Sequence, residues 1–204
     1  MNKPFRFELG LLCGWAAALV WSAIRPHDYF TWFLEVVPGV IGALVLLATF
    51  RHFRFTRLTY TVVLLHCVVL FVGGHYTYAE VPAFAWIQET FGHSRNNYDK
   101  VGHFMQGFGP ALVAREVYAR RGIVKPGRWL AFLTVCTCMA ISALYELIEW
   151  AVAVSSGEGA EAFLGTQGYE WDTQSDMLYA TIGALIAVGL FGRWQDRQIA
   201  RRAP

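Results

Sequence analysis

Charged residues are scarce in this sequence of 204 residues. They make up 16% of it, whereas a typical soluble domain has about 25%. Hydrophobic residues make up 55%, including 8 Trp, 9 Tyr and 15 Phe. This composition argues against a soluble globular domain and favours an integral membrane protein. The formal net charge of only +2 indicates that nucleic acid is not a partner.

Cysteine is also rare, and its positions argue against a disulfide framework. All four cysteines fall inside apolar stretches, where they are expected to behave as small buried hydrophobic residues. They are Cys13, Cys67, Cys136 and Cys138. The sequence therefore gives no reason to assign them a redox or metal-binding role.

What the sequence has in abundance is long apolar stretches. A transmembrane helix needs about 20 mostly apolar residues. Six stretches meet or approach this length, although polar residues stand at the starts of the fourth and sixth. The predicted spans are 7–24, 31–49, 59–79, 99–118, 130–153 and 175–192. We therefore expect residues 1–204 to form one integral membrane domain, an all-α polytopic helix bundle with about six transmembrane helices.

The first apolar stretch could be a cleaved signal peptide or a retained span. Lys3 and Arg6 precede it, as basic residues precede a signal peptide. It is long for a signal peptide, however, contains Trp15 and Trp21, and lacks a persuasive small-residue cleavage site. We therefore interpret it as a retained first span.

Lysine and arginine are distributed unevenly between the two ends of the predicted spans. Fourteen of the 17 basic residues lie at one end, and only Arg25, Arg95 and Lys100 lie at the other. Positively charged loops are usually cytoplasmic. Both termini are therefore predicted to be cytoplasmic.

The acidic residues show the opposite bias. Glu8, Glu116 and Asp196 are on the predicted cytoplasmic side, and the other 12 acidic residues are on the outer side or in the outer half of a span. The positive-inside rule does not require this, because Asp and Glu contribute little to topology. Ionisable residues within membrane segments are expensive and usually functional. The acidic bias therefore predicts a functional site at the outer face.

Two predicted spans each present several polar residues on one helical face. In the fourth span, Asp99, His103 and Gln106 are spaced i, i+4, i+7. In the fifth span, Glu146 and Glu149 are spaced i, i+3. Residues with these spacings are neighbours on a helix surface. Because neighbouring spans alternate in direction, both groups should lie at the same depth.

The sixth and third spans add polar residues at that depth. Asp172 and Asp176 are spaced i, i+4 at the start of the sixth span, and His75 lies at the outer end of the third. Tyr145 stands beside the two glutamates of the fifth span, and Gln167 lies in the outer loop before the sixth. We expect these helices to line one pocket that opens outward.

Such a pocket could support three kinds of chemistry. Carboxylates can hold a divalent cation such as Mg²⁺ or Mn²⁺, and an added imidazole admits Zn²⁺ or Fe. Crowded carboxyls can also act as a general acid and base, or relay protons in a transporter. The predicted catalytic residues are Asp99, His103, Glu146, Glu149, Asp172 and Asp176. The predicted metal ligands are His103, Glu146, Glu149 and Asp176. The predicted substrate-binding residues are His75, Gln106, Tyr145 and Gln167.

Structural explanations compete for some of these residues. Asp99 and Lys100 could be an interfacial pair in which the lysine reaches toward the headgroups. Asp172 could cap the sixth helix, and Glu35 could interact with the dipole of the second. The two glutamates of the fifth span have no such explanation, because acids are disfavoured near a helix C-terminus. These two residues are the strongest sign of a site.

The outer loops each suggest a short helix. Pro82 is placed to begin one within residues 80–98, whose aromatic residues would suit the membrane interface. A second is expected within residues 154–171. A plain connector is the alternative for both loops.

Several motifs in order resemble the YjdF-like family of uncharacterised bacterial inner-membrane proteins. They are GGHYTYAEVP, NNYDKVGHFMQGFGPALVARE, SALYELIEW and FLGTQGYEWDTQSDMLYATIGA. The resemblance runs from about residue 30 to residue 192, and implies a membrane fold and an inner-membrane location but no reaction.

A looser resemblance is to VanZ-like proteins, which are linked to glycopeptide resistance. The TQGYEWDTQSD loop and Glu146 depart from the VanZ-like pattern, and the first three spans differ, so the resemblance implies no resistance function. The matching positions are Asp99, Lys100, His103, Phe104, Tyr145, Glu149, Asp176 and Gly183.

The sequence thus leaves three hypotheses for function. The leading one is a membrane-embedded enzyme, metal-dependent or acid/base, that acts at the outer leaflet on a lipid or lipid-linked envelope substrate. The second is a small-solute or proton-coupled transporter, which should have polar residues continuing toward the cytoplasm. The third is a non-catalytic envelope sensor or assembly factor.

Overall fold

The computed structural model describes residues 5–156 and 166–201, and within them it contains helices and no strands. Each of the six predicted spans falls on a long helix, so the all-α membrane bundle is confirmed. The second short helix, expected within residues 154–171, falls largely outside the described residues. The helical segments are α1 (Arg6–Ser22), α2 (Tyr29–Thr49), α3 (Arg57–Tyr76), η2 (Tyr78–Glu80), α4 (Pro82–Phe91), α5 (Tyr98–Arg120), α6 (Arg128–Ser156), α8 (Asp172–Ile186), η4 (Ala187–Phe191) and α9 (Gly192–Ala200).

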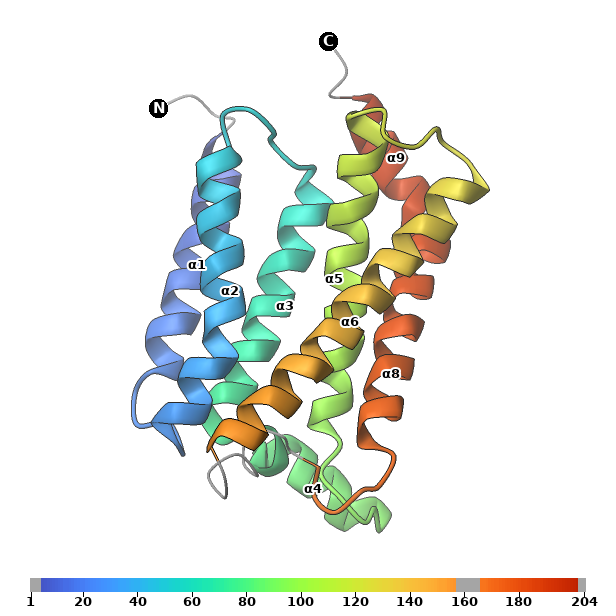
Figure 1. The fold of residues 1–204 in the computed structure, drawn as a ribbon. Helices are drawn as coiled ribbons and strands as arrows, with labels where there is room; N and C mark the ends of the chain where they lie inside the picture. The colour runs from blue at the N-terminus through green and yellow to red at the C-terminus, as the bar shows by residue number, and fades with distance from the viewer. Residues whose placement is uncertain (1–4, 157–165, 202–204) are drawn as a thin grey trace.

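The long helices run up and down, and α1 begins at the same end of the bundle at which α9 ends (Figure 1). Four segments are long and apolar enough to span a membrane, namely α2, α3, α6 and the run from Asp172 to Ala200. Helix α1 has only 17 residues, and α5 contains many polar residues. The count of six spans and the cytoplasmic termini therefore stay predictions.

The helix boundaries differ from the predicted spans by a few residues, and the third and sixth spans show this clearly. The third span was expected to reach residue 79, but α3 ends at Tyr76 because Thr77 has a positive φ of 55°. The sixth was expected to cover 175–192. Its helix begins instead at Asp172 and continues through a π-helical turn to Ala200.

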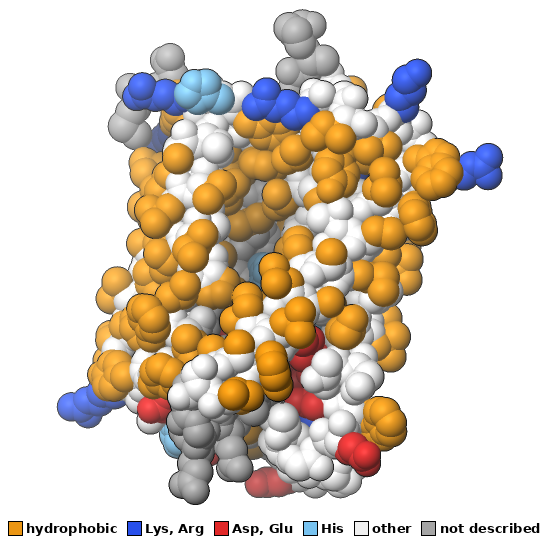
Figure 2. Space-filling view, viewed as in Figure 1, with side chains coloured by type: hydrophobic (Ala, Val, Ile, Leu, Met, Phe, Trp, Pro, Cys, Tyr) orange, Lys and Arg blue, Asp and Glu red, His pale blue; other side chains and the backbone are white. Residues whose placement is uncertain are grey.

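Charge is segregated between the two ends of the bundle. Figure 2 shows most of the visible lysine and arginine side chains at the end where α1 begins and α9 ends, acidic side chains toward the opposite end, and hydrophobic side chains between them. We call these the basic end and the acidic end. The described part of α4 has no buried residue and lies across the acidic end (Figure 1). A short helix beginning at Pro82 is therefore confirmed.

Helix α5 is at the centre of the bundle and packs against α3, α6 and α8. Its contact with α8 is very close, because a Cβ atom on Gly107 would overlap the backbone of Ala180. A Cβ atom on Gly183 would likewise overlap the carbonyl of Phe104. The close crossing brings the polar N-terminal turns of α5 and α8 together at the acidic end.

Candidate functional site

Asp99, Asp172 and Asp176 form a cluster of buried aspartates at the acidic end, which we call the aspartate cluster. Two buried cations, Lys100 and Arg95, contact these aspartates. The Lys100 ammonium lies 3.1 Å from Asp99, 2.8 Å from Asp172 and 2.6 Å from Asp176. The Arg95 guanidinium contacts Asp172 at 2.5 Å and Asp99 at 3.3 Å. All five side chains are buried. Asp172 therefore pairs with cations rather than capping α8, and Lys100 points into the protein rather than toward headgroups.

His103 lies between the aspartate cluster and α6. Its Nε2 atom is 3.2 Å from Asp99 and 3.8 Å from Asp176. Its Nδ1 atom is 3.3 Å from Gln106 Oε1 and 3.8 Å from Glu146 Oε1. The imidazole is buried. Two of these neighbours are aspartates of α5 and α8, so the ring is held from two helices at once.

A cavity of about 270 Å³ lies beside His103. Residues of α2, α3, α5 and α6 form its walls, together with Tyr78 of η2. Its polar wall residues are Glu35, His66, Tyr78, Asp99, His103, Gln106, Tyr145 and Glu149. The remaining walls are apolar or glycine, so the cavity is amphipathic.

Three buried glutamates near His103 have no Lys or Arg partner among the described residues, and we call Glu35, Glu146 and Glu149 the glutamate group. Glu35 is 3% exposed and Glu149 is 9% exposed, and both line the cavity. Glu146 points an oxygen with no hydrogen-bond partner toward His103. Within the described residues, none of the three forms an ion pair with Lys or Arg. Glu35 has Tyr78 as a hydrogen-bonding neighbour.

Helix α6 continues well beyond the two glutamates that the sequence placed near its C-terminus. The described helix ends at Ser156, seven residues after Glu149. The helix dipole acts mainly within the last turn, so the dipole argument for these residues was wrong. Their burial without a Lys or Arg partner among the described residues is the better reason to regard them as functional.

The distances between the side chains of the site indicate which of them could hold a metal ion. Ligand atoms of Asp99, His103 and Asp176 lie within 4.8 Å of one another. The Lys100 ammonium, however, already contacts both of these carboxylates. A divalent cation would have to displace it. Of the predicted ligands, this group includes His103 and Asp176 but neither Glu146 nor Glu149.

The predicted substrate-binding residues separate into two pairs. Gln106 and Tyr145 line the cavity. His75 and Gln167 are not among its lining residues. His75 Nδ1 is 3.1 Å from the Ser22 carbonyl oxygen, and its ring lies 4.6 Å from that of Trp21.

Gln167 joins two loops at the acidic end. Its side chain accepts a hydrogen bond from the Asn96 N–H at 3.0 Å and donates one to the Asn96 carbonyl at 2.9 Å. This contact connects the segment before α5 to the segment before α8. The neighbouring Arg95 thereby comes close to Asp172.

Sequence reasoning missed several residues of the site. The sequence alone explained Glu35 by an interaction with the dipole of its helix. However, Pro38, Gly39 and Gly42 follow Glu35 on the same helical face, and they also line the cavity. That spacing was a usable signal. From the sequence alone, Arg95 stands only as an exception to the charge bias, and Lys100 only as that and as an interfacial partner of Asp99. Two basic residues among outer acids could have suggested ion pairs.

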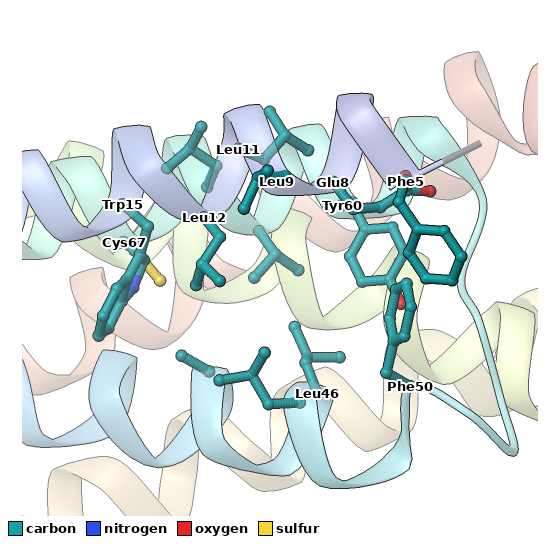
Figure 3. Close-up of a pocket in the computed structure, with 14 residues that line it drawn as sticks. Phe5, Glu8, Leu9, Leu11, Leu12, Trp15, Leu46, Phe50, Tyr60 and Cys67 are labelled. Carbon is teal, nitrogen blue, oxygen red and sulfur yellow. The ribbon is translucent and has the colours of Figure 1, made fainter. Parts of the chain in front are cut away.

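A larger cavity of about 420 Å³ lies among α1, α2 and α3 (Figure 3). Leu9, Leu11, Leu12 and Leu46 give it an apolar lining, and Trp15 and Cys67 lie together at one end. Its one carboxyl group, Glu8, is paired with Arg54 at 2.6 Å. This cavity lacks a set of reactive groups and is not the candidate site.

An apolar core separates the site from a second polar network at the basic end. Leu58, Val62, Ala111 and Leu112 are buried in that core. Beyond it, the fully buried Glu116 is held by two threonines and an arginine. Its hydrogen-bond donors are Thr56, Thr59 and Arg120.

Comparisons with known proteins bear on family and location. A family model described as "Predicted membrane protein (DUF2238)" matches residues 7–197. The chain is 51% identical to the inner membrane protein YjdF of Escherichia coli (strain K12). The match runs over 183 residues, which are 90% of this chain and 88% of that protein. No solved structure matches. The match and the apolar helices place this chain in the bacterial inner membrane.

Proposed function

The chain belongs to the DUF2238 family of predicted membrane proteins, and we propose that it is a membrane-embedded acid/base enzyme. Its substrate would be an amphiphilic lipid or lipid-linked envelope molecule. The observation that supports this proposal is the position of His103 and Glu149 on the wall of one buried amphipathic cavity.

The shape of the cavity suits a molecule with a polar head and an apolar chain. Along α5 its wall extends from Asp99 to Pro110, which is about 16 Å at 1.5 Å per residue. This is about half of the roughly 30 Å hydrocarbon thickness of a bilayer. The polar groups are gathered toward the acidic end, and Pro38, Leu70 and Ile141 contribute apolar walls.

His103 and Glu149 are the residues to which we assign proton transfer. An imidazole and a carboxyl beside a cavity can together serve as a general acid and base pair. Asp99 and Asp176 hold the imidazole at 3.2 Å and 3.8 Å. In this scheme the aspartate cluster is paired with Arg95 and Lys100, and it positions His103 instead of binding a metal ion.

The direction of the cavity favours an enzyme or binding protein over a transporter. A transporter should continue its polar residues toward the opposite side of the membrane. The buried core around Ala111 and Leu112 instead separates the cavity from the Glu116 network. If the predicted orientation holds, the cavity meets its substrate in the outer leaflet.

Lipid turnover by the purified full chain tests the proposal. The chain would be placed in nanodiscs with a total bacterial lipid extract, and lipid species would be followed by mass spectrometry. We expect some species to be converted, and His103→Gln and Glu149→Gln to lower the rate by about 10²-fold or more, the usual contribution of a general acid or base.

Glu89→Gln is the matched control. Glu89 is an exposed carboxyl at the same end of the bundle, so this variant should turn over lipid at the unaltered rate. Thermal unfolding would confirm that all variants are folded. If no lipid species changes, or if folded His103→Gln is as active as the unaltered chain, the proposal is wrong.

A further inference from the structure

We infer that the polar head accepted by this cavity contains an ammonium group, and that an alkyl or acyl chain forms the apolar part of the ligand. The inference rests on the proposed function and adds the chemical class of the ligand. It follows from an excess of buried carboxyl groups that the protein's own cations do not balance.

The aspartate cluster has its own counterions. Three aspartates face Arg95 and Lys100 at ion-pair distances of 2.5–3.3 Å. His103, 3.2 Å from Asp99, can supply a third positive charge. Three carboxylates and three potential cations leave this group nearly neutral.

The glutamate group has no equivalent set of counterions. Its three carboxyls are at least nine-tenths buried, and in the described part of the chain no Lys or Arg pairs with them. Glu149 lines the cavity. No hydrogen bond or ion pair joins its carboxyl group to another described residue. A buried carboxylate is stable only when it is paired or neutralised. A cationic ligand in the cavity would supply the missing charge.

The lining also argues against an anionic head. Phosphate recognition relies on Arg, Lys or clustered backbone N–H groups. No Lys or Arg is found among the described residues that line the cavity, where Glu35, Asp99 and Glu149 present carboxyls. The glutamates also do not belong to the close ligand group formed by Asp99, His103 and Asp176. An organic ammonium fits this spread of carboxyls better than a small metal ion.

An opening between α2 and α6 gives the chain of the ligand a path to the bilayer. Helix α2 packs mainly on α3, whereas α6 packs on α5 and α8. Figure 2 shows a hollow in this face of the molecule, with a histidine side chain deep inside it. Gly39 and Gly42 line the α2 side, and Ile141 lines the α6 side. The apolar chain can therefore remain among lipids while the head reaches Glu149.

Ligand binding can be measured without turnover. The purified full chain in a neutral detergent would be titrated with dodecylamine, dodecanol and dodecyl phosphate, and its unfolding temperature would be followed by tryptophan fluorescence. We expect a concentration-dependent rise with dodecylamine alone. Glu35→Gln and Glu149→Gln should each weaken the apparent affinity about 10-fold or more, as expected for a lost hydrogen bond to a charged group.

Two phenylalanine variants test the opening. Gly42→Phe places a large side chain at the cavity wall, where a Cβ atom meets nothing within 4 Å. Gly10→Phe is the matched control, because Gly10 on α1 is exposed and a Cβ atom there also meets nothing within 4 Å. Gly42→Phe should abolish the response to dodecylamine, and Gly10→Phe should retain it.

The amine could come from a phospholipid headgroup or from a single-chain amine. Competition of dodecylamine binding by phosphatidylethanolamine, but not by phosphatidylglycerol, would assign it to the phospholipid. Absence of competition would assign it to a single-chain amine.

The inference is overturned if dodecanol or dodecyl phosphate stabilises the chain as well as dodecylamine does, or if the response survives both Gln substitutions. His103→Gln keeps the glutamates and should still bind dodecylamine. Loss of turnover with retained binding would therefore separate the two proposals. Turnover without amine binding would overturn only the assignment of the headgroup.

Discussion

The Lys100 ammonium lies 2.6 Å from the Asp176 carboxylate and joins the first turns of α5 and α8 inside the protein. Asp99 and Asp172 contact the same ammonium. One buried cation thus determines how two polar helix ends, 76 residues apart in the sequence, can pack.

Lys100→Met should strongly destabilise the protein. It leaves three buried aspartates with Arg95 as the remaining Lys or Arg partner among the described residues, and breaking a buried ion pair costs about 3–5 kcal/mol. The free energy of unfolding, measured by thermal or denaturant unfolding in detergent, should fall accordingly. Lys125→Met, at an exposed loop position, is the control and should change little. Equal stability of the two variants would contradict the described packing.

Small residues at the α5–α8 crossing should be intolerant of added volume. Gly107→Ala and Gly183→Ala would each place a methyl group against the backbone of the facing helix. Overpacking of this kind costs about 1–3 kcal/mol and exceeds the roughly 0.5–1 kcal/mol that Ala gains over Gly in a helix. Gly10→Ala meets no atom and should be neutral or stabilising. Unfolding temperatures of the three variants would test this order.

The start of α2 should show a small acid-dependent loss of stability. The Asp28 side chain accepts a hydrogen bond from the Thr31 N–H at 2.6 Å, and this bond lowers the pKa of Asp28 below its usual value. A carboxyl with a lowered folded-state pKa stabilises the protein above its unfolded pKa and loses that effect as the pH falls through the folded value.

Asp28→Ala should therefore cost about 1 kcal/mol near neutral pH, and the cost should shrink as the pH falls below about 4. Asp28→Asn keeps a capping side chain and should lack this pH dependence. Unfolding temperatures of the three proteins across an acid series would measure it. A cost that grows toward acid pH would contradict a lowered pKa for Asp28 in the folded protein.

Chelation should leave the protein unaffected if the acid/base proposal holds. Lys100 occupies the position between Asp99 and Asp176 that a cation would need. Metal analysis of protein purified without chelator should find no stoichiometric ion, and EDTA should change neither turnover nor the unfolding temperature. One zinc or manganese ion per chain, with loss of stability on chelation, would favour the metal-dependent alternative.

Thiol labelling can test the predicted orientation. Glu89→Cys in α4 and Lys125→Cys in the loop after α5 place cysteines at exposed positions at opposite ends of the bundle. In intact cells, a membrane-impermeant maleimide should label only the Glu89→Cys variant. The unaltered chain, whose four cysteines all lie in helices, is the control. Labelling of Lys125→Cys alone would reverse the topology.

Helical periodicity predicted which residues share a face, but not which helices meet. The spacing of Asp99 and His103 on one face needed only the 3.6-residue repeat, and the two side chains lie 3.2 Å apart. Small residues four positions apart allow two helices to approach closely, and Ala180 and Ala184 of α8 are both fully buried. Gly10 and Gly14 show the same spacing, yet both are exposed. Spacing alone does not say whether another helix is present.

The sequence by itself determined the membrane class, the long helices and the depth at which the acids gather, because these depend on local composition and period. It also indicated that the two glutamates of α6 belong to a functional site. The tertiary structure decided how the charges divide. Lys100 and Arg95 form ion pairs with the aspartates, whereas Glu35 and Glu149 face a cavity. Ion pairing depends on distances between helices far apart in the chain, and the packing of those helices, including the close α5–α8 crossing at Gly107 and Gly183, sets those distances. The acidic bias toward one end thus becomes two groups of carboxyls, one with counterions and one without.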